Sequence, residues 1–227
     1  MTLPHPPKML LMDLDGTLVD SVPDLTHCVD DMLQALGRPP CGEDKVRLWV
    51  GNGVERLVER ALAGDMEGKV EPELRERGLA RFLACYRDRH AVQSRVYPGV
   101  LEGLEALRGR FSLGCVTNKP ARFTAPLLRA MGLDGYFEVV VAGDTLPQKK
   151  PDPAPLLFAA RQFDVDPGDA LMVGDSRSDV EAARAAGFGI VCVSYGYNHG
   201  IDIREQRPDA VIDRLTQLPE LLAPPAP

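Results

Sequence analysis

The chain has 227 residues, of which 44% are hydrophobic and 26% are charged, and its formal net charge is −7. This length accommodates one α/β domain with a substantial core, or a core with a small inserted domain. The negative charge and the lack of a Lys/Arg run exclude the usual nucleic-acid-binding proteins. No apolar stretch is long enough for a membrane span or a signal peptide. We therefore expect a cytoplasmic protein that binds neither nucleic acid nor membrane.

The first predicted element is a buried parallel strand at residues 9–12, a continuously apolar run. Apolar residues at three- and four-residue steps then predict a helix over 22–36, with Ser21 as a possible N-cap. The stretch 44–62 predicts two short helices broken by Gly51-Asn52-Gly53, and residues 72–91 predict an amphipathic helix. Residues 20–92 are therefore expected to be all helical.

Beyond a turn at 97–99, the pattern alternates between strands and helices. The predicted strands are 111–116, 137–142, 170–173, 189–194 and 210–212, and the predicted helices between them are 100–108, 120–131, 154–163 and 178–186. Such alternation predicts βαβ units and a parallel sheet. We expect an α/β fold whose Rossmann-like parallel-sheet core comprises 1–19 and 93–227, with a small helical cap at 20–92 inserted after the first strand.

The five cysteines are odd in number, and none lies in a C-x-x-C pair. Thiols of cytoplasmic proteins are usually reduced, so we expect free and mostly buried cysteines rather than disulfides. The residues concerned are Cys28, Cys41, Cys85, Cys115 and Cys192.

Four polar clusters follow predicted strands, at 13–17 (DLDGT), 117–119 (TNK), 149–153 (KKPDP) and 174–179 (GDSRSD). Open α/β sheets bind ligands at the carboxyl ends of their strands, so one fold can bring these clusters together. In the first cluster, Asp13 and Asp15 can face one site if the chain stays extended. The same letters also fit a solvated turn or part of a calcium loop, but the further acidic ligands of a calcium loop are missing.

Each of the other clusters has a plain structural alternative. A hydroxyl and a backbone N–H at Thr117 and Asn118 can hold phosphoryl oxygens, but a helix cap accounts for them equally well. Lys150 precedes a proline that fixes its direction, although a lysine pair is usually a solvated loop. Asp175 is a candidate ligand for a hard metal, and Asp179 is also placed to cap a helix.

In this order and spacing, the four clusters resemble the motifs of the haloacid dehalogenase superfamily, whose nucleophile motif matches DLDGTLVDS at 13–21. Longer segments resemble the bacterial phosphoglycolate phosphatases of that superfamily, at 49–62, 116–120, 149–156, 173–187 and 195–200. The resemblance implies a Mg²⁺-dependent phosphomonoester hydrolase that forms an aspartyl phosphate. Its implied partner is a small-molecule phosphate monoester, with 2-phosphoglycolate as the leading substrate, and its implied oligomeric state is monomer or homodimer.

The resemblance also implies roles for the acidic residues. Asp13 would be the nucleophile, and Asp15 would be the general acid and then the general base. Mg²⁺ would be held by Asp13, Asp175 and the backbone carbonyl of Asp15. Asp179 would orient Lys150 or a water on the metal from outside the ligand set.

The phosphoryl oxygens would be held by Thr117 and by the Asn118 N–H, with their charge neutralised by Lys150. Lys149 is the alternative for that charge, but the lysine of the superfamily directly precedes proline. No histidine lies within the motifs, which leaves the proton transfers to Asp15.

Recognition of the substrate carboxylate is expected in the cap. Gly51-Asn52-Gly53 precedes a helix whose N-terminal N–H groups can hold an anion, with Arg56 or Arg47 assisting. A plain helix–helix turn with surface arginines is an equal alternative. The competing functions are a broad sugar-phosphate phosphatase, a pyrophosphatase, a phosphomutase and a binding protein on an inactive phosphatase fold.

Overall fold

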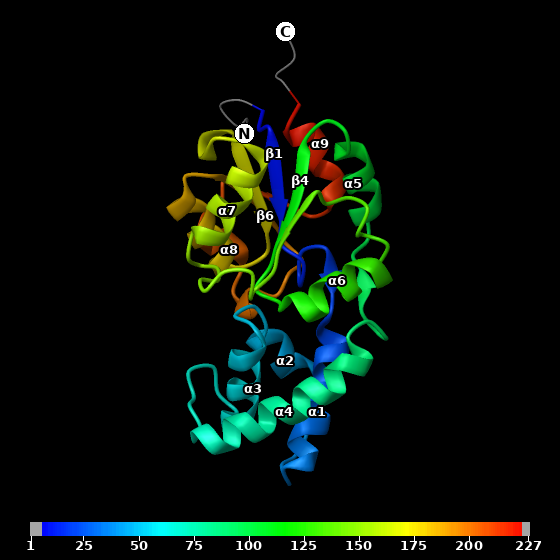
Figure 1. The fold of residues 1–227 in the computed structure, drawn as a ribbon, viewed down its shortest axis with the longest axis vertical. Coiled ribbons are helices and arrows are strands. Elements are labelled where there is room, and N and C mark those ends of the chain that lie inside the picture. Colours follow the sequence, from blue (N-terminus) through cyan, green and yellow to red (C-terminus); the bar gives the residue numbers. More distant parts are fainter. Residues whose placement is uncertain (1–5, 224–227) are drawn as a thin grey trace.

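A six-stranded sheet forms the centre of the computed structural model, which describes residues 6–223 (Figure 1). The strand order is β5-β4-β1-β6-β7-β8, and every neighbouring pair is parallel. The strands are β1 (Met9–Met12), β4 (Ser112–Val116), β5 (Val139–Val141), β6 (Ala170–Gly174), β7 (Gly189–Val193) and β8 (Ala210–Ile212). The predicted α/β fold with a parallel sheet is confirmed.

Helices cover both faces of this sheet (Figure 1). Leu10 and Met12 of β1 pack with α5 and α9 on one face, whereas Met9 and Leu11 pack with α7 and α8 on the other. Because side chains alternate along a strand, a strand covered on both faces must be apolar throughout, as β1 is. The helices are α5 (Val100–Leu107), α6 (Ala121–Ala130), α7 (Ala154–Phe163), α8 (Arg177–Ala186) and α9 (Leu218–Leu221). Short 3₁₀ turns occupy Pro167–Asp169, Asn198–Gly200, Ile203–Gln206 and Leu215–Gln217.

Four helices between β2 and β3 form a unit with its own apolar core, which we call the helical unit. They are α1 (Val22–Ala35), α2 (Glu43–Trp49), α3 (Val54–Ala63) and α4 (Pro72–Arg89). In Figure 1 they lie beyond the carboxyl ends of the central strands. Gly78 of α4 allows close approach, since a Cβ there would lie 2.8 Å from a methyl carbon of Leu62. That the helical unit is a separate cap domain with the predicted boundaries stays a prediction, and residues 1–5 and 224–227 of the predicted core lie outside the described part.

A two-stranded antiparallel sheet, β2 (Val19–Asp20) with β3 (Arg95–Val96), joins the helical unit to the rest. These strands were not predicted, because two residues are too short to show strand periodicity. Beside them, the buried Asp24 accepts hydrogen bonds from the backbone N–H groups of Gln93 and Ser94 and from the Ser94 hydroxyl. The Asp24 carboxylate therefore holds the chain between α4 and β3, which is the second of the two connections between the helical unit and the rest of the protein.

The expectation of five free thiols was wrong. The structure pairs Cys28 of α1 with Cys85 of α4 in a disulfide, with their Cα atoms 5.5 Å apart. The two residues are 57 positions apart in sequence and meet only because α1 packs on α4, so spacing gave no signal. Cys41, Cys115 and Cys192 are free. In the described part, no helix is both long and apolar enough to cross a membrane.

Candidate active site

The carboxyl ends of three adjacent strands bring the predicted clusters together. Asp13 follows β1, Thr117 follows β4 and Asp175 follows β6, in the order β4-β1-β6 across the sheet. The ladder continues into the site, since Asp13 N–H donates to the Val173 carbonyl at 2.9 Å. Parallel strands thus present their first polar side chains at one edge, as expected for an open α/β sheet.

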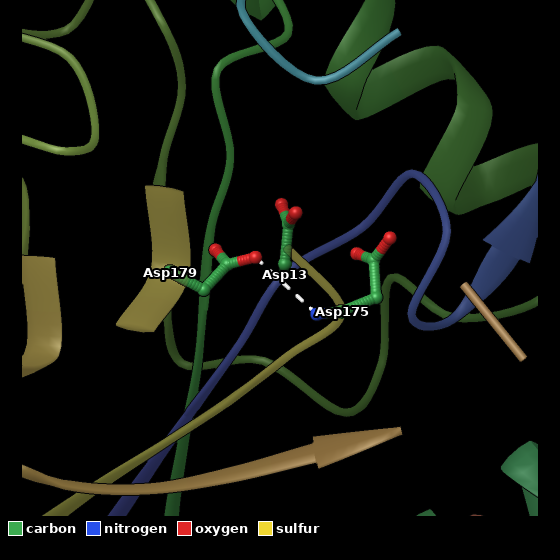
Figure 2. Close-up of side chains that lie close together, drawn as sticks. All are labelled: Asp13, Asp175 and Asp179. Atoms are coloured by element: carbon green, nitrogen blue, oxygen red, sulfur yellow. Dashed lines mark hydrogen bonds between the residues drawn. The ribbon is translucent and has the colours of Figure 1, made fainter. Parts of the chain in front are cut away.

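Three buried carboxylates form the centre of the site. One oxygen each of Asp13, Asp175 and Asp179 lies within 4.8 Å of the others, and the three groups lie side by side in Figure 2. Asp179 is held from α8, where it accepts from the backbone N–H groups of Asp175 and Ser176 and from the Ser176 hydroxyl. The acid therefore caps a helix and joins the cluster, so the two explanations of this position are compatible.

Among residues 6–223, Lys150 supplies the one cationic contact of this cluster. Its buried Nζ lies 2.9 Å from an Asp13 oxygen and 2.6 Å from an Asp179 oxygen, and it donates to the Val116 carbonyl at 2.8 Å. These contacts use all three N–H groups of the ammonium. Lys149 instead lies toward the helical unit, near Gly53.

The charge of the cluster is only partly compensated by Lys150. Burial raises the pKa of the Asp13 carboxyl to about 7, against the opposing effect of Lys150 and with the help of Asp179. Burial, Asp179 and Asp13 likewise raise the pKa of Asp175 well above its usual value. Bringing a cation among these oxygens relieves the repulsion, and an all-oxygen set of carboxylates suits Mg²⁺. The donor set therefore fits the metal that the superfamily resemblance implies.

Gly16 shows how closely the site is packed. Its φ of +89° lies in the left-handed region, and a Cβ there would overlap the Asp175 carboxylate. The turn that Gly16 makes, with its N–H donating to the Val19 carbonyl at 2.9 Å, brings the chain back toward β2 directly after Asp15.

Asp15 lies outside the carboxylate cluster and faces a pocket. Its carboxylate accepts from the Ser21 hydroxyl at 2.6 Å and from Lys119 Nζ, which is 3.0 Å from both oxygens. Neither Ser21 nor Lys119 was predicted as a partner of Asp15. Ser21 sits at the N-cap position of α1 but makes no side-chain cap bond.

The pocket lies between the sheet edge and the helical unit. The sheet side contributes polar groups, whereas the helical unit contributes apolar side chains and backbone. The lining residues are Asp13, Asp15, Thr117, Asn118 and Lys119 from the sheet side, and Leu25, Val50, Gly51, Gly53, Val54 and Leu57 from the helical unit. Asn118 joins the two sides, since its side-chain amide donates to the carbonyls of Gly51 and Lys150.

Only part of the 51–56 turn, which was predicted to bind the substrate carboxylate, lines this pocket. Gly51 and Gly53 line it, whereas Asn52 does not. Arg56 is directed away, with its guanidinium 2.7 Å from Glu59 and donating to the Met66 carbonyl. The other candidate, Arg47, is likewise engaged, by Glu43 at 2.8 Å and by Asp20. No arginine of the described residues lines the pocket.

Two further residues hold Asp175 and were not predicted. The Thr17 hydroxyl donates to one Asp175 oxygen at 2.9 Å, and the Tyr197 N–H donates to the other at 2.8 Å. The Tyr197 hydroxyl also accepts from the Ser21 N–H and donates to Asp20, so it reaches the first connection to the helical unit. For Thr17, the signal was its place within the first cluster. For Tyr197, the signal was its place within the 195–200 segment that resembles the bacterial phosphoglycolate phosphatases, although no pattern assigned it a contact with Asp175.

Comparisons with known proteins agree with this arrangement. A protein named phosphoglycolate phosphatase from Nitrosococcus oceani is 59% identical over 218 residues, which cover 96% of this chain and 97% of that protein. Phosphoglycolate phosphatase 1 of Pseudomonas aeruginosa is 53% identical, over 93% of this chain and 78% of its own. A crystal structure described as a predicted phosphoglycolate phosphatase from Haemophilus somnus has a TM-score of 0.90 and 35% identity, over 95% of this chain and 98% of its own. The family model of haloacid dehalogenase-like hydrolases matches residues 7–187. The chain belongs to the haloacid dehalogenase-like hydrolase family.

Proposed function

We propose that this chain is a Mg²⁺-dependent phosphatase that converts 2-phosphoglycolate to glycolate and phosphate through an aspartyl phosphate on Asp13. The observation that carries the proposal is the meeting of Asp13, Asp175 and Lys150 at one sheet edge, with Asp15 facing the adjoining pocket. The substrate name rests on the relatives named phosphoglycolate phosphatase, at 59% and 53% identity.

Asp13 performs the first step by attack of a carboxylate oxygen on phosphorus. The bond from phosphorus to the ester oxygen breaks, and the phosphoryl group is transferred to Asp13. Asp13, Asp175 and the Asp15 carbonyl would hold Mg²⁺, which when bound supplies positive charge between the nucleophile and the phosphoryl group. Lys150, fixed by Asp179, adds a second positive charge on the Asp13 side.

Asp15 serves both proton transfers. It gives a proton to the departing glycolate oxygen and then removes one from the water that hydrolyses the aspartyl phosphate. Ser21 and Lys119 fix its direction toward the pocket. Thr117 and the Asn118 N–H lie on the same wall and would hold phosphoryl oxygens. The apolar residues of the helical unit keep other water away from the intermediate.

The proposal is tested by phosphate release in the presence of Mg²⁺ from a substrate panel: 2-phosphoglycolate, pyrophosphate, glucose phosphates and an aryl phosphate. A kcat/KM for 2-phosphoglycolate well above all others is the expected result. A flat profile would replace the substrate with a broad range of phosphate monoesters. Isomerised sugar phosphate without release would indicate a phosphomutase, and no turnover would indicate a binding protein. We also propose a cytoplasmic location and a monomer or homodimer.

A further inference from the structure

The shape of 2-phosphoglycolate fixes where its carboxylate must lie. A single methylene carbon separates the ester oxygen from the carboxylate, and Asp15 must contact that ester oxygen in order to protonate it. The substrate carboxylate therefore lies next to the Asp15 side chain. Once Asp15 has given its proton to the ester oxygen, its carboxylate and the glycolate carboxylate repel each other unless a cation lies between or beside them.

Lys119 is the cation at this place. Its Nζ is 3.0 Å from both Asp15 oxygens, and among the described residues that line the pocket it has the only cationic side chain. Lys150 has no N–H group to spare, because Asp13, Asp179 and a backbone carbonyl use all three. Arg56 is held by residues 59–68, away from the pocket.

The position of Lys119 is fixed from both sides of the pocket. Its backbone N–H donates to the Thr117 hydroxyl at 3.2 Å, and its ammonium lies 5.1 Å from the centre of the Tyr86 ring of α4. Only 4% of Lys119 is exposed. Burial opposes the charge, but Asp15 and Tyr86 raise the pKa of Lys119 above its usual value, so the side chain is an ammonium at neutral pH. The site thus presents a preformed, ordered positive charge next to Asp15.

We infer that Lys119 binds the carboxylate of the substrate and is the residue that selects 2-phosphoglycolate over phosphate esters without a carboxylate. The inference rests on the proposed function. In the complex, the ammonium is shared between Asp15 and the substrate carboxylate, so one side chain both aims the acid and recognises the leaving group. The apolar wall of Leu25, Val54 and Leu57 strengthens this ion pair by excluding water.

The test compares the ratio of kcat/KM for 2-phosphoglycolate to kcat/KM for ethyl phosphate in the wild type and in Lys119→Met. The ethyl ester has no carboxylate, but its alkoxide leaving group needs a proton from Asp15 just as glycolate does. Loss of a charge-assisted contact predicts a fall of about 10- to 100-fold in this ratio. Turnover of p-nitrophenyl phosphate, which needs no acid for its leaving group, shows that the variant is folded. Lys119→Arg should recover part of the ratio because it keeps the charge. Lys149→Met removes the lysine near Gly53, which does not line the pocket, and Lys45→Met removes an exposed lysine. Both variants should keep the wild-type ratio.

A second measurement does not need turnover. In an Asp13→Asn background, calorimetry gives the affinities for 2-phosphoglycolate and for inorganic phosphate with and without Lys119→Met. We expect the affinity for 2-phosphoglycolate to fall about 10- to 100-fold more than the affinity for phosphate.

The outcomes separate the two proposals. A wild-type enzyme without preference for 2-phosphoglycolate overturns the proposed function and the assignment of Lys119 with it. A wild-type preference that survives Lys119→Met, or that is lost in Lys149→Met instead, overturns the assignment alone. Equal losses of kcat/KM for 2-phosphoglycolate and ethyl phosphate, with equal losses of affinity for 2-phosphoglycolate and for phosphate, would also overturn the assignment. Lys119 would then only hold Asp15 in place.

Discussion

Replacing the nucleophile should make the metal-free protein more stable while abolishing turnover. The pKa of Asp13 rises from 3.8 to about 7 on folding, mainly through burial. The folded protein thus binds this proton more tightly than the unfolded chain does. Stability contributed by the protonated form is complete below about pH 4 and is lost as the pH rises to about 7. At pH 8 this pKa difference destabilises the folded wild type by about 4 kcal/mol. The neutral side chain of Asp13→Asn avoids that cost, but Lys150 loses one partner, so we expect a net gain of about 2–4 kcal/mol.

Thermal unfolding followed by circular dichroism, in excess chelator, measures this effect. At pH 8 the Tm of Asp13→Asn should exceed that of the wild type by about 5–15 °C, and at pH 5 the gain should be less than half as large. Asp134→Asn, at an exposed position, is the matched control and should leave the Tm unchanged. An Asp13→Asn variant less stable than the wild type at pH 8 would refute the reasoning, because Asp13 would then contribute more through Lys150 than its burial costs.

Two further outcomes are expected. Excess chelator should stop phosphate release, and added Mg²⁺ should restore it. The reason is that the Asp13–Asp175–Asp179 cluster keeps excess negative charge, which a bound cation must offset before a phosphate can approach. Full activity in excess chelator would show that the mechanism needs no metal. Asp24→Ala should lower the free energy of unfolding by about 2–4 kcal/mol. It removes the acceptor of the Gln93 N–H and of the N–H and hydroxyl of the buried Ser94. Denaturant unfolding measures that loss, and a change below about 0.5 kcal/mol, the usual size for a surface substitution, would contradict it.

The parts of the fold predictable from sequence are those with local periodicity. The central strand at 9–12 and the break at Gly51–Gly53 between α2 and α3 lie where the residue pattern indicated. The β2–β3 pair was missed because each strand has only two residues and pairs across the whole helical unit. The Cys28–Cys85 disulfide was missed because it depends on how α1 packs on α4.

The candidate site also has a part that the sequence predicts and a part that depends on long-range packing. That Asp13, Thr117 and Asp175 lie together could be predicted because each directly follows a strand, and parallel strands end at a common edge. The contacts of Lys119 with Asp15 and of Tyr197 with Asp175 join residues 104 and 22 positions apart. Their geometry depends on how the loops and the helical unit are placed against the sheet edge, and no local pattern in the sequence specifies that placement.

The central claim is that Asp13 takes the phosphoryl group of 2-phosphoglycolate. It is tested most directly by mixing the enzyme and Mg²⁺ with substrate carrying a radioactive phosphoryl group, quenching in acid during turnover, and mapping the labelled peptide. We predict label on the peptide that contains Asp13, and none in Asp13→Asn. Phosphate release at the full rate without label on the protein, or label on a different residue, would contradict the account.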